Sequence, residues 1–341
     1  MRRTIIVLAG LVFTAALAGC GEPQPSSFAP GEDGNLVFEN DYGDNALAVG
    51  AYSFVEVRTS ASTPGRVESV EDVVVESPEV FEVSDVDGRA FSIEAVGQGS
   101  AQLRVVVQLD DGTTRDDRFI LSAKSPESVE LFISRCQDTD TLLADQVYGA
   151  EIFLYAADEP SPLVATGMES PLYGEPSQLV SISDEVAGIR QVDLVTAPEQ
   201  TGGAEVFSTF DDSLVRTLSV VEAEAADELD IYFQLTGDEL RDEPFEEDWE
   251  QGEAHVIAAE QFTGNERICG ASQFLFQSLT PDVCELYDPD DSGQNNPATS
   301  HIGEAVRMKT HGVGDCLLQV DQQDVDPGEA LSEQFETTSV P

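Results

Sequence analysis

The sequence predicts an all-β protein made of tandem antiparallel β-sandwich domains, and three features of the pattern support this fold class. Apolar residues alternate with polar ones, as Leu103, Val105 and Val107 do, which is the period of a half-buried strand. Clusters of Gly, Pro, Asp and Ser separate these stretches, and only residues 222–228 have a helical composition. Parallel sheets need crossover helices, so we expect antiparallel strands.

The alternating stretches can be placed along the chain. Residues 103–107, 129–133 and 229–235 show the clearest alternation. Further short strands are expected at residues 73–75, 151–155, 191–195, 217–221, 255–258, 273–276 and 317–320. Many short strands separated by turn residues are typical of sandwiches of about 100 residues each.

Length and charge limit the classes of function. The chain has 341 residues, of which 41% are hydrophobic, so at roughly 150 residues per domain it is expected to hold two or three packed domains. It carries 66 acidic and 16 basic side chains, a formal net charge of -50. Such a body repels phosphate backbones, so nucleic acid is excluded as a partner.

The first residues have the layout of a secretory signal peptide. Arg2 and Arg3 precede an apolar run from Thr4 to Ala16, and small residues lead to Cys20. The run is shorter than the roughly 20 residues that span a bilayer. The motif Leu17-Ala18-Gly19-Cys20 resembles the bacterial lipobox. The alternative is a plain signal peptide followed by a chance cysteine.

The lipobox resemblance implies an address and an anchor. It implies that residues 1–19 are removed and that Cys20 receives a diacylglycerol on its thiol and a fatty acid such as palmitate on its new amine. Several acyl chains hold a protein stably on a membrane. Gly21 in place of Asp is similar to lipoproteins of the outer membrane. We therefore expect a lipid-anchored protein that faces either the periplasm or the exterior.

Two terminal segments are expected to be loose. Residues 20–34, the lipidated cysteine and the stretch after it, are rich in Pro, Gly, Ser and Glu and predict a flexible tether. Residues 326–341 are similarly polar and predict a flexible tail.

An internal repeat sets the size of the folding unit. The segment Ser77-Pro78-Glu79-Val80-Phe81-Glu82-Val83 returns as Thr280-Pro281-Asp282-Val283-Cys284-Glu285-Leu286, and each copy is followed by a Gly-x-Gly entry into a strand, at Gly97 and at Gly312. The first copy resembles bacterial Ig-like domains of the Big family. This resemblance predicts Ig-like domains at residues 35–125 and 227–325. Residues 126–226 lack the Ser-Pro signature and are assigned as another β-sandwich by size and strand pattern.

The cysteines other than Cys20 form an even set. Four cysteines in an exported protein predict two disulfides, with three possible connectivities. In the repeat, Cys284 and Cys316 match Phe81 and Ala101, a large and a small residue suited to face each other in a core. The repeat therefore favours a Cys284–Cys316 bridge, which leaves Cys136 to pair with Cys269. Zinc binding is the alternative, but no closely spaced Cys/His set supports it.

Candidates for chemistry are few. The three histidines have no catalytic motif around them, so we expect no catalytic residues. The loop from Asp288 to Asn296 places the oxygen ligands Asp288, Asp290 and Ser292 at alternating positions, like the front of an EF-hand loop. The twelfth position is Thr299 rather than Glu. The alternatives are a Ca²⁺ site and an acidic surface turn; no other cofactor is expected.

These features predict a non-catalytic role. We expect a membrane-anchored bacterial lipoprotein that serves in surface adhesion and protein binding, or in the structure of the envelope. The alternative is a carbohydrate-binding accessory lipoprotein, which requires an exposed row of aromatic residues on one sheet. An unknown protein or glycan is the expected partner, besides the membrane.

Overall fold

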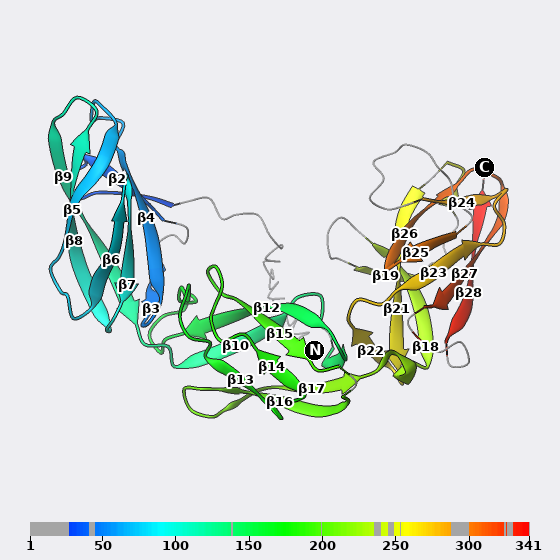
Figure 1. Ribbon diagram of the computed structural model, residues 1–341. Coiled ribbons are helices and arrows are strands. Elements are labelled where there is room, and N and C mark those ends of the chain that lie inside the picture. Colours follow the sequence, from blue (N-terminus) through cyan, green and yellow to red (C-terminus); the bar gives the residue numbers. More distant parts are fainter. Residues whose placement is uncertain are drawn as a thin grey trace, which may run out of the picture.

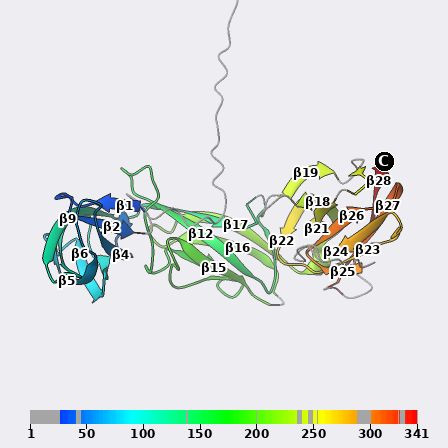
Figure 2. The same ribbon diagram turned by 90° about the horizontal axis from the view of Figure 1, so that it is seen from above.

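The protein is built from strands, as the sequence predicts. The computed structural model describes residues 27–40, 45–137, 139–198, 200–234, 240–244, 249–252, 254–287, 300–323, 325 and 330–340. This part of the chain holds 28 strands and one 3-10 helix, η1 (Ala223–Ala225). Figures 1 and 2 show the strands gathered into three bodies that follow one another along the chain. The predicted class of tandem Ig-like antiparallel β-sandwiches is confirmed.

The first sandwich packs two sheets around one core. One sheet has the order β1-β2-β4-β7-β6 and the other β3-β9-β8-β5. Phe38, Phe81, Phe91 and Leu103 are among the fully buried residues between them. The strands are β1 (Ser27–Pro30), β2 (Leu36–Asn40), β3 (Leu47–Ala48), β4 (Tyr52–Thr59), β5 (Val67–Val75), β6 (Phe81–Asp87), β7 (Ala90–Ala95), β8 (Gly99–Leu109) and β9 (Thr114–Lys124).

The second sandwich packs the sheet β10-β12-β15-β14 against the start of a ten-stranded sheet, β13-β16-β17-β11. Ile133, Leu154, Val180 and Val206 are fully buried in its core. The strands are β10 (Ser128–Ile133), β11 (Thr141–Leu143), β12 (Val147–Tyr155), β13 (Leu172–Glu175), β14 (Val180–Ile182), β15 (Gln191–Thr196), β16 (Gly202–Ser208) and β17 (Leu214–Val221).

The third sandwich continues the ten-stranded sheet through β22-β21-β18-β19, with β26 and β24 beside β21, and packs it against β20-β28-β27-β23-β25. Trp249, Phe276 and Met308 are buried between the sheets. The strands are β18 (Glu228–Gln234), β19 (Leu240–Pro244), β20 (Trp249–Glu250), β21 (Ala254–Thr263), β22 (Glu266–Cys269), β23 (Phe274–Ser278), β24 (Cys284–Tyr287), β25 (Ser300–Gly303), β26 (Ala305–Thr310), β27 (Gly314–Gln322) and β28 (Ser332–Val340).

The internal repeat is a hydrogen-bonded turn. In the first sandwich the Val80 amide donates to the Ser77 carbonyl (2.9 Å), and the Val80 carbonyl accepts from the amides of Val96 (2.9 Å) and Gly97 (3.1 Å). A Cβ on Gly97 would collide with the Glu79 carbonyl oxygen, so the close approach of the two chains requires glycine at that position.

The third sandwich repeats the same bonds at the same spacing. The Val283 amide donates to the Thr280 carbonyl (2.9 Å), and the Val283 carbonyl accepts from the amides of His311 (2.9 Å) and Gly312 (3.1 Å). A Cβ on Gly312 would collide with the Asp282 carbonyl oxygen. The two sequence copies therefore have the same local fold.

The second sandwich has a copy of this turn that the sequence analysis missed. The Leu179 amide donates to the Pro176 carbonyl (2.8 Å), and the Leu179 carbonyl accepts from the Ala197 amide (3.0 Å). The strand that follows starts at Gly202 with a φ of 142°, as Gly99 and Gly314 do in the other copies with φ values of 149° and 136°. Pro176 occupies the position of Ser77 and Thr280 in the other copies. Because the residue type differs there, the sequence comparison did not detect this copy.

The structure corrects four local expectations. Residues 27–30 of the predicted tether form β1, which pairs with β2. Residues 332–340 of the predicted tail form β28, which pairs with β27 along its whole length. Of the helical segment 222–228, only Ala223–Ala225 is helical. Finally, β3, β11 and β20 pair in parallel with their neighbours. Their partners lie more than 70 residues away along the chain, so intervening strands make the connection that a crossover helix makes in a βαβ unit.

A buried carboxylate fixes the start of the first sandwich. The Asp117 side chain is fully buried, and its oxygens accept from the backbone amides of Asp33 (2.8 Å), Asn35 (2.7 Å), Leu36 (2.9 Å) and Arg118 (2.8 Å). Its neighbour Asp116 is half-exposed and pairs with Arg104 at 2.8 Å. Asp117 thus holds the turn before β2 against β9.

We predict that Asp117→Asn destabilises the first sandwich by about 3 kcal/mol, because hydrogen bonds to a charged group contribute roughly 1.5 to 3 kcal/mol each and the orphaned amides stay buried. Asp116→Asn is the matched control and should change stability by less than about 1 kcal/mol, as for an exposed ion pair. Urea unfolding of the full chain measures both. Equal unfolding midpoints for the two variants would contradict this role of Asp117.

Candidate functional site

The first and second sandwiches are joined by backbone hydrogen bonds as well as by the connecting chain. Strand β3 pairs in parallel with the end of β9 and makes an isolated bridge to Val164 of the second sandwich. The Ala48 amide donates to the Val164 carbonyl (2.8 Å), and the Val164 amide donates to the Ala46 carbonyl (3.0 Å). Val164 packs in the core of the first sandwich, whereas Ala46 and Ala48 pack in the core of the second.

Strand β11 has the same role between the second and third sandwiches. It pairs in parallel with β17 on one side and with β22 on the other, so one continuous sheet crosses the junction. The Tyr148 hydroxyl donates to the carbonyls of Leu143 (3.1 Å) and Cys269 (2.8 Å), and burial raises the pKa of this hydroxyl. Figure 1 shows β22 beside the second sandwich at this junction.

Both disulfides favoured by the sequence are present. Cys136–Cys269 joins the second and third sandwiches, and Cys284–Cys316 lies inside the core of the third; the Cα atoms are 5.7 Å apart in each. Phe81 and Ala101, the residues that match the second pair in the first sandwich, are both buried in its core.

Arginines hold the segment that leads into β11. The Arg216 guanidinium donates to the carbonyls of Cys136 (3.1 Å) and Thr139 (2.8 Å) and to the Asp140 carboxylate (2.7 Å). Arg267 donates to the Arg135 carbonyl (2.6 Å) and pairs with Glu260 at 2.7 Å, and both of these charged side chains are largely buried. The second junction therefore combines a shared strand, a disulfide and a set of charged hydrogen bonds.

A cavity of about 370 Å³ lies at this second junction. Residues 134–136, which follow β10, and residues 146–149 at the start of β12 line it from the second sandwich, and residues of β21, β22, the start of β23 and the start of β26 line it from the third. The disulfide Cys136–Cys269, Tyr148 and Phe274 contribute to its lining. Its charged lining residues are Arg135, Arg267, Glu260 and Glu304, so their formal charges cancel.

The outer face of the sheet β10-β12-β15 has a row of aromatic residues. Phe132 is 41% exposed and packs edge-on against Phe153 with ring centroids 5.1 Å apart. Arg190 lies 4.4 Å over the Phe153 ring and pairs with Glu151. Tyr155 continues the row along β12. We call Phe132, Phe153, Tyr155 and Arg190 the aromatic face of the second sandwich.

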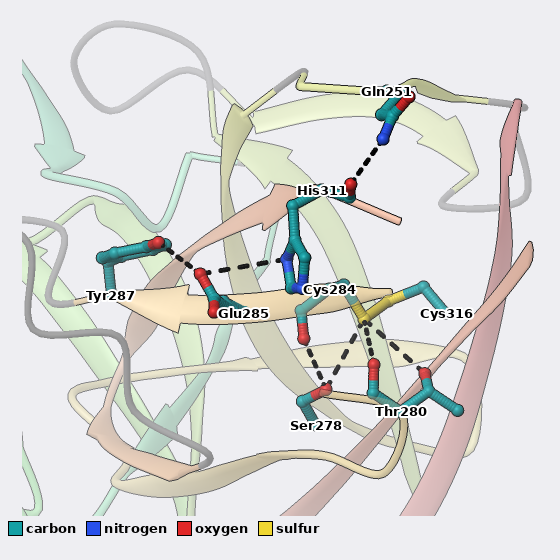
Figure 3. A network of polar contacts seen from close by, with 8 residues as sticks. All are labelled: Gln251, Ser278, Thr280, Cys284, Glu285, Tyr287, His311 and Cys316. Atoms are coloured by element: carbon teal, nitrogen blue, oxygen red, sulfur yellow. Dashed lines mark hydrogen bonds and ion pairs between the residues drawn. A yellow bond between two sulfur atoms is a disulfide. The ribbon is translucent and has the colours of Figure 1, made fainter. Parts of the chain in front are cut away.

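A polar network surrounds the disulfide of the third sandwich, as Figure 3 shows. The Tyr287 hydroxyl donates to Glu285 at 2.6 Å, and this bond, aided by burial, raises the pKa of Tyr287 to about 12. His311 Nδ1 lies 3.8 Å from the same carboxylate. The Ser278 hydroxyl donates to the Cys284 carbonyl (2.8 Å). Here the histidine faces a carboxylate, and the hydroxyl groups bond to that carboxylate or to the backbone.

Two sets of predicted site residues lie outside the described residues. These are Cys20 and the loop that carries Asp288, Asp290 and Ser292. Within the described ranges, no group of three or more His, Cys, Asp or Glu side chains is placed to hold a metal ion, and no helix is long and apolar enough to cross a bilayer. Lipidation of Cys20 and calcium binding by the loop of Asp288, Asp290 and Ser292 therefore stay predictions.

Comparisons with known proteins give similarity at the level of architecture. No family model matches the chain, and no curated protein matches it. Among solved structures, it is similar to FdeC, an Escherichia coli adhesin, at 12% identity over 87% of this chain and 95% of that one, with a TM-score of 0.27.

Two further solved structures are similar at the same low level. Domains 4–9 of the surface layer protein SbsC share 12% identity over 89% of this chain and 47% of that one, with a TM-score of 0.27. The Bacteroides ovatus protein SGBP-B of a mixed-linkage glucan utilization locus shares 9% identity over 88% and 67%, with a TM-score of 0.24. The function of this chain is therefore inferred from its own residues.

We predict that replacing Cys136 and Cys269 together by serine loosens the second junction while each sandwich keeps its strands. On the chain-entropy model, a disulfide that closes 133 residues contributes about 5 kcal/mol. Amide hydrogen exchange should rise at Thr141–Leu143, with circular dichroism unchanged.

The control is the double serine variant of Cys284 and Cys316. This bridge closes 32 residues inside one core, so its loss should destabilise the third sandwich by about 3 to 4 kcal/mol and leave exchange in β11 unchanged. If both variants gave the same exchange in β11, the bridge at the junction would not be what holds that strand.

Proposed function

We propose that this chain is a lipid-anchored bacterial lipoprotein whose sandwiches form a stiff, non-catalytic module for surface adhesion and protein binding or for a structural role in the envelope. The observation that carries the proposal is that both junctions contain a strand hydrogen-bonded to the sandwiches on either side. Domains joined by a simple linker move relative to each other by default. Shared strands and a disulfide instead favour a fixed spacing, which suits a spacer or a display module.

The surroundings of the reactive side chains support a binding role. His255 packs on Trp249 with ring centroids 4.6 Å apart, and His311 faces Glu285. Cys136, Cys269, Cys284 and Cys316 are oxidised as disulfides. A triad would instead need a histidine within hydrogen-bond reach of a nucleophile. The module is therefore proposed to act through its surfaces and its length.

The proposed anchor is the lipid on Cys20 in the outer membrane, with the sandwiches on the periplasmic or extracellular side. The formal charge of -50 supports a lipid anchor, because an acidic body is repelled by anionic headgroups and gains no electrostatic attachment. A Ca²⁺ ion at Asp288, Asp290 and Ser292 is a separate prediction, and the proposed function does not depend on it.

We predict that Cys20→Ser abolishes labelling with a palmitate analogue and moves the protein from the membrane fraction to the soluble fraction, because without the lipid nothing attaches an acidic chain to the bilayer. Ser26→Ala, six residues further on, is the control and should leave both readouts unchanged. Mass analysis that finds an unmodified mature terminus in the unsubstituted protein would contradict the anchor.

Crosslinking on intact cells tests the binding role, and protease treatment of the same cells reports the side of the membrane. Capture of a defined neighbour by a protease-sensitive protein supports adhesion. Full protection from added protease favours a structural role in the envelope instead. Turnover of any substrate by the purified chain would overturn the non-catalytic proposal.

A carbohydrate-binding accessory role is the second candidate, and the aromatic face of the second sandwich favours it. Three aromatic side chains lie on the outer side of one sheet, with Arg190 and Glu151 beside them. Aromatic side chains offer large apolar contact with few degrees of freedom, while nearby charged groups supply hydrogen bonds. The same face suits a protein partner.

We predict that Phe132→Ala lowers affinity for the partner of this face by about tenfold, because it removes the most exposed ring of the row and its aromatic contact. Tyr173→Ala is the control, since Tyr173 stacks on Phe207 on the opposite sheet. A glycan array, followed by crosslinking with each variant, measures the effect and separates glycan from protein partners. Equal binding by both variants would exclude the aromatic face.

A further inference from the structure

Strand β10 forms an open edge of the second sandwich. In the described part of the chain it pairs with β12 on one side and with no strand on the other. The Ser134 amide donates to the Gly149 carbonyl (2.9 Å), and the register from there places the even-numbered residues of β10 in hydrogen-bonded pairs with β12. The backbone groups of Val129 and Leu131 therefore point away from the sheet, and no backbone group of the described residues bonds to them.

The exposure of these two residues agrees with an open edge. Val129 and Leu131 belong to the core of the second sandwich, yet they are 9% and 7% exposed. The core residues of the interior strand β12 that lie beside them, Ala150, Ile152 and Leu154, are 2%, 1% and 0% exposed. The remaining exposure of the β10 residues is what the uncovered side of an edge strand adds.

The other edge strands of the described chain are irregular or short. β5 and β6 are longer than β10, but register shifts interrupt both, and a register shift also interrupts β19. Such bulges are a common way to block pairing at the edge of a sheet. The remaining edge strands, β1, β3, β13, β14, β20, β24 and β25, have two to four residues. β10 runs for six residues without a register shift, so it is the edge best suited to pair with a further strand.

The chemistry of this edge indicates what can occupy it. Amides and carbonyls that alternate along a strand are matched by the backbone of another extended chain. The charged side chains of β10 and the residue before it are acidic, Glu130 and Glu127, and both are exposed. A second copy of this chain would bring a further charge of -50 to the same edge. Charge complementarity therefore favours a basic segment.

We propose that β10 binds an extended, basic peptide segment of a partner protein, which becomes the new edge strand of this sheet. The backbone of the segment pairs with Val129 and Leu131. Its residues alternate, with apolar side chains beside these two residues and lysine or arginine beside Glu130. The proposal rests on the protein-binding part of the proposed function and names the kind of partner. It concerns the edge of the sheet, whereas the aromatic rings lie on its outer face.

The test is titration of the full mature chain with a synthetic eight-residue peptide of alternating lysine and valine, monitored by nuclear magnetic resonance. The Val129 and Leu131 amides should exchange with solvent about tenfold more slowly when free peptide is at ten times its dissociation constant. The Glu130 and Phe132 amides, which already bond to β12, should not change.

Two control peptides separate backbone pairing from simple charge attraction. One has glutamate in place of lysine, and the other is N-methylated on its valines, whose amides would face β10. Both should bind at least about tenfold more weakly, because the first is repelled and the second lacks the hydrogen-bond donors.

Variants connect the binding to this edge. Val129→Pro removes one outward amide, a change that edge strands tolerate, and should weaken binding of the lysine peptide by about tenfold. Val129→Ala keeps the amide and is the matched control. Glu130→Lys should weaken binding by about fivefold. Glu205→Lys makes the same charge change at an exposed position on the opposite sheet and should bind as the unsubstituted chain does.

Melting temperatures show which variants fold, and if Val129→Pro does not fold, Glu130→Lys and the N-methylated peptide decide. Unchanged exchange at Val129 and Leu131 would overturn the proposal, as would equal binding of the lysine peptide and its N-methylated form. Self-association of the unsubstituted chain that Val129→Pro abolishes would assign the edge to a second copy and overturn it too. These measurements use purified protein, so their failure is distinct from a failure to capture a neighbour on intact cells.

Discussion

The architecture depends on backbone hydrogen bonds that cross from one sandwich to the next. β3 and β11 are two and three residues long, yet each has a neighbour on both sides, one in each adjoining sandwich. Each such bond is worth only about 1 kcal/mol net, but an amide that loses its partner in a buried place is penalised more. Bending either junction therefore breaks several bonds at once, which makes a fixed geometry the stable one.

The three sandwiches place different residues at equivalent buried positions beside the repeated turn. In each sandwich the residue after this turn and the residue two positions after a glycine of positive φ are buried in the same core. The corresponding residues are Phe81 and Ala101 in the first sandwich, Val180 and Ala204 in the second, and Cys284 and Cys316 in the third, and all six are buried. A large and a small side chain, two smaller ones, or a disulfide fill the same place. A covalent bond in the third sandwich thus takes the position of a packing contact in the first.

Strands and disulfides could be predicted from the sequence where the pattern of residues is local or repeated. Alternation predicted β8, β10 and β15, because their buried residues follow a strict period of two. The repeat led to both disulfides, since Cys284 and Cys316 occupy positions that face each other in the matching turn. β28 was missed because Ser332–Val340 is mostly polar. β3 and β11 were missed because a pairing of two or three residues leaves no periodic pattern. The role of Asp117 gave no signal in the sequence, because three of the four amides that bond to its carboxylate belong to residues 81 to 84 positions away.

The placement of the few basic residues shows where stiffness matters most. Against 66 acidic side chains the chain has only 16 basic ones, so a structural arginine is a scarce group here. Two of them, Arg216 and Arg267, donate to backbone carbonyls of the segment 135–139 that leads into β11. An arginine that only balanced surface charge would be screened by salt and would contribute little. Arginines that bond backbone carbonyls beside a disulfide hold one chain segment in one conformation. The bond from Arg267 to the Arg135 carbonyl also joins two residues that line the junction cavity, so one contact holds the segment and borders the cavity.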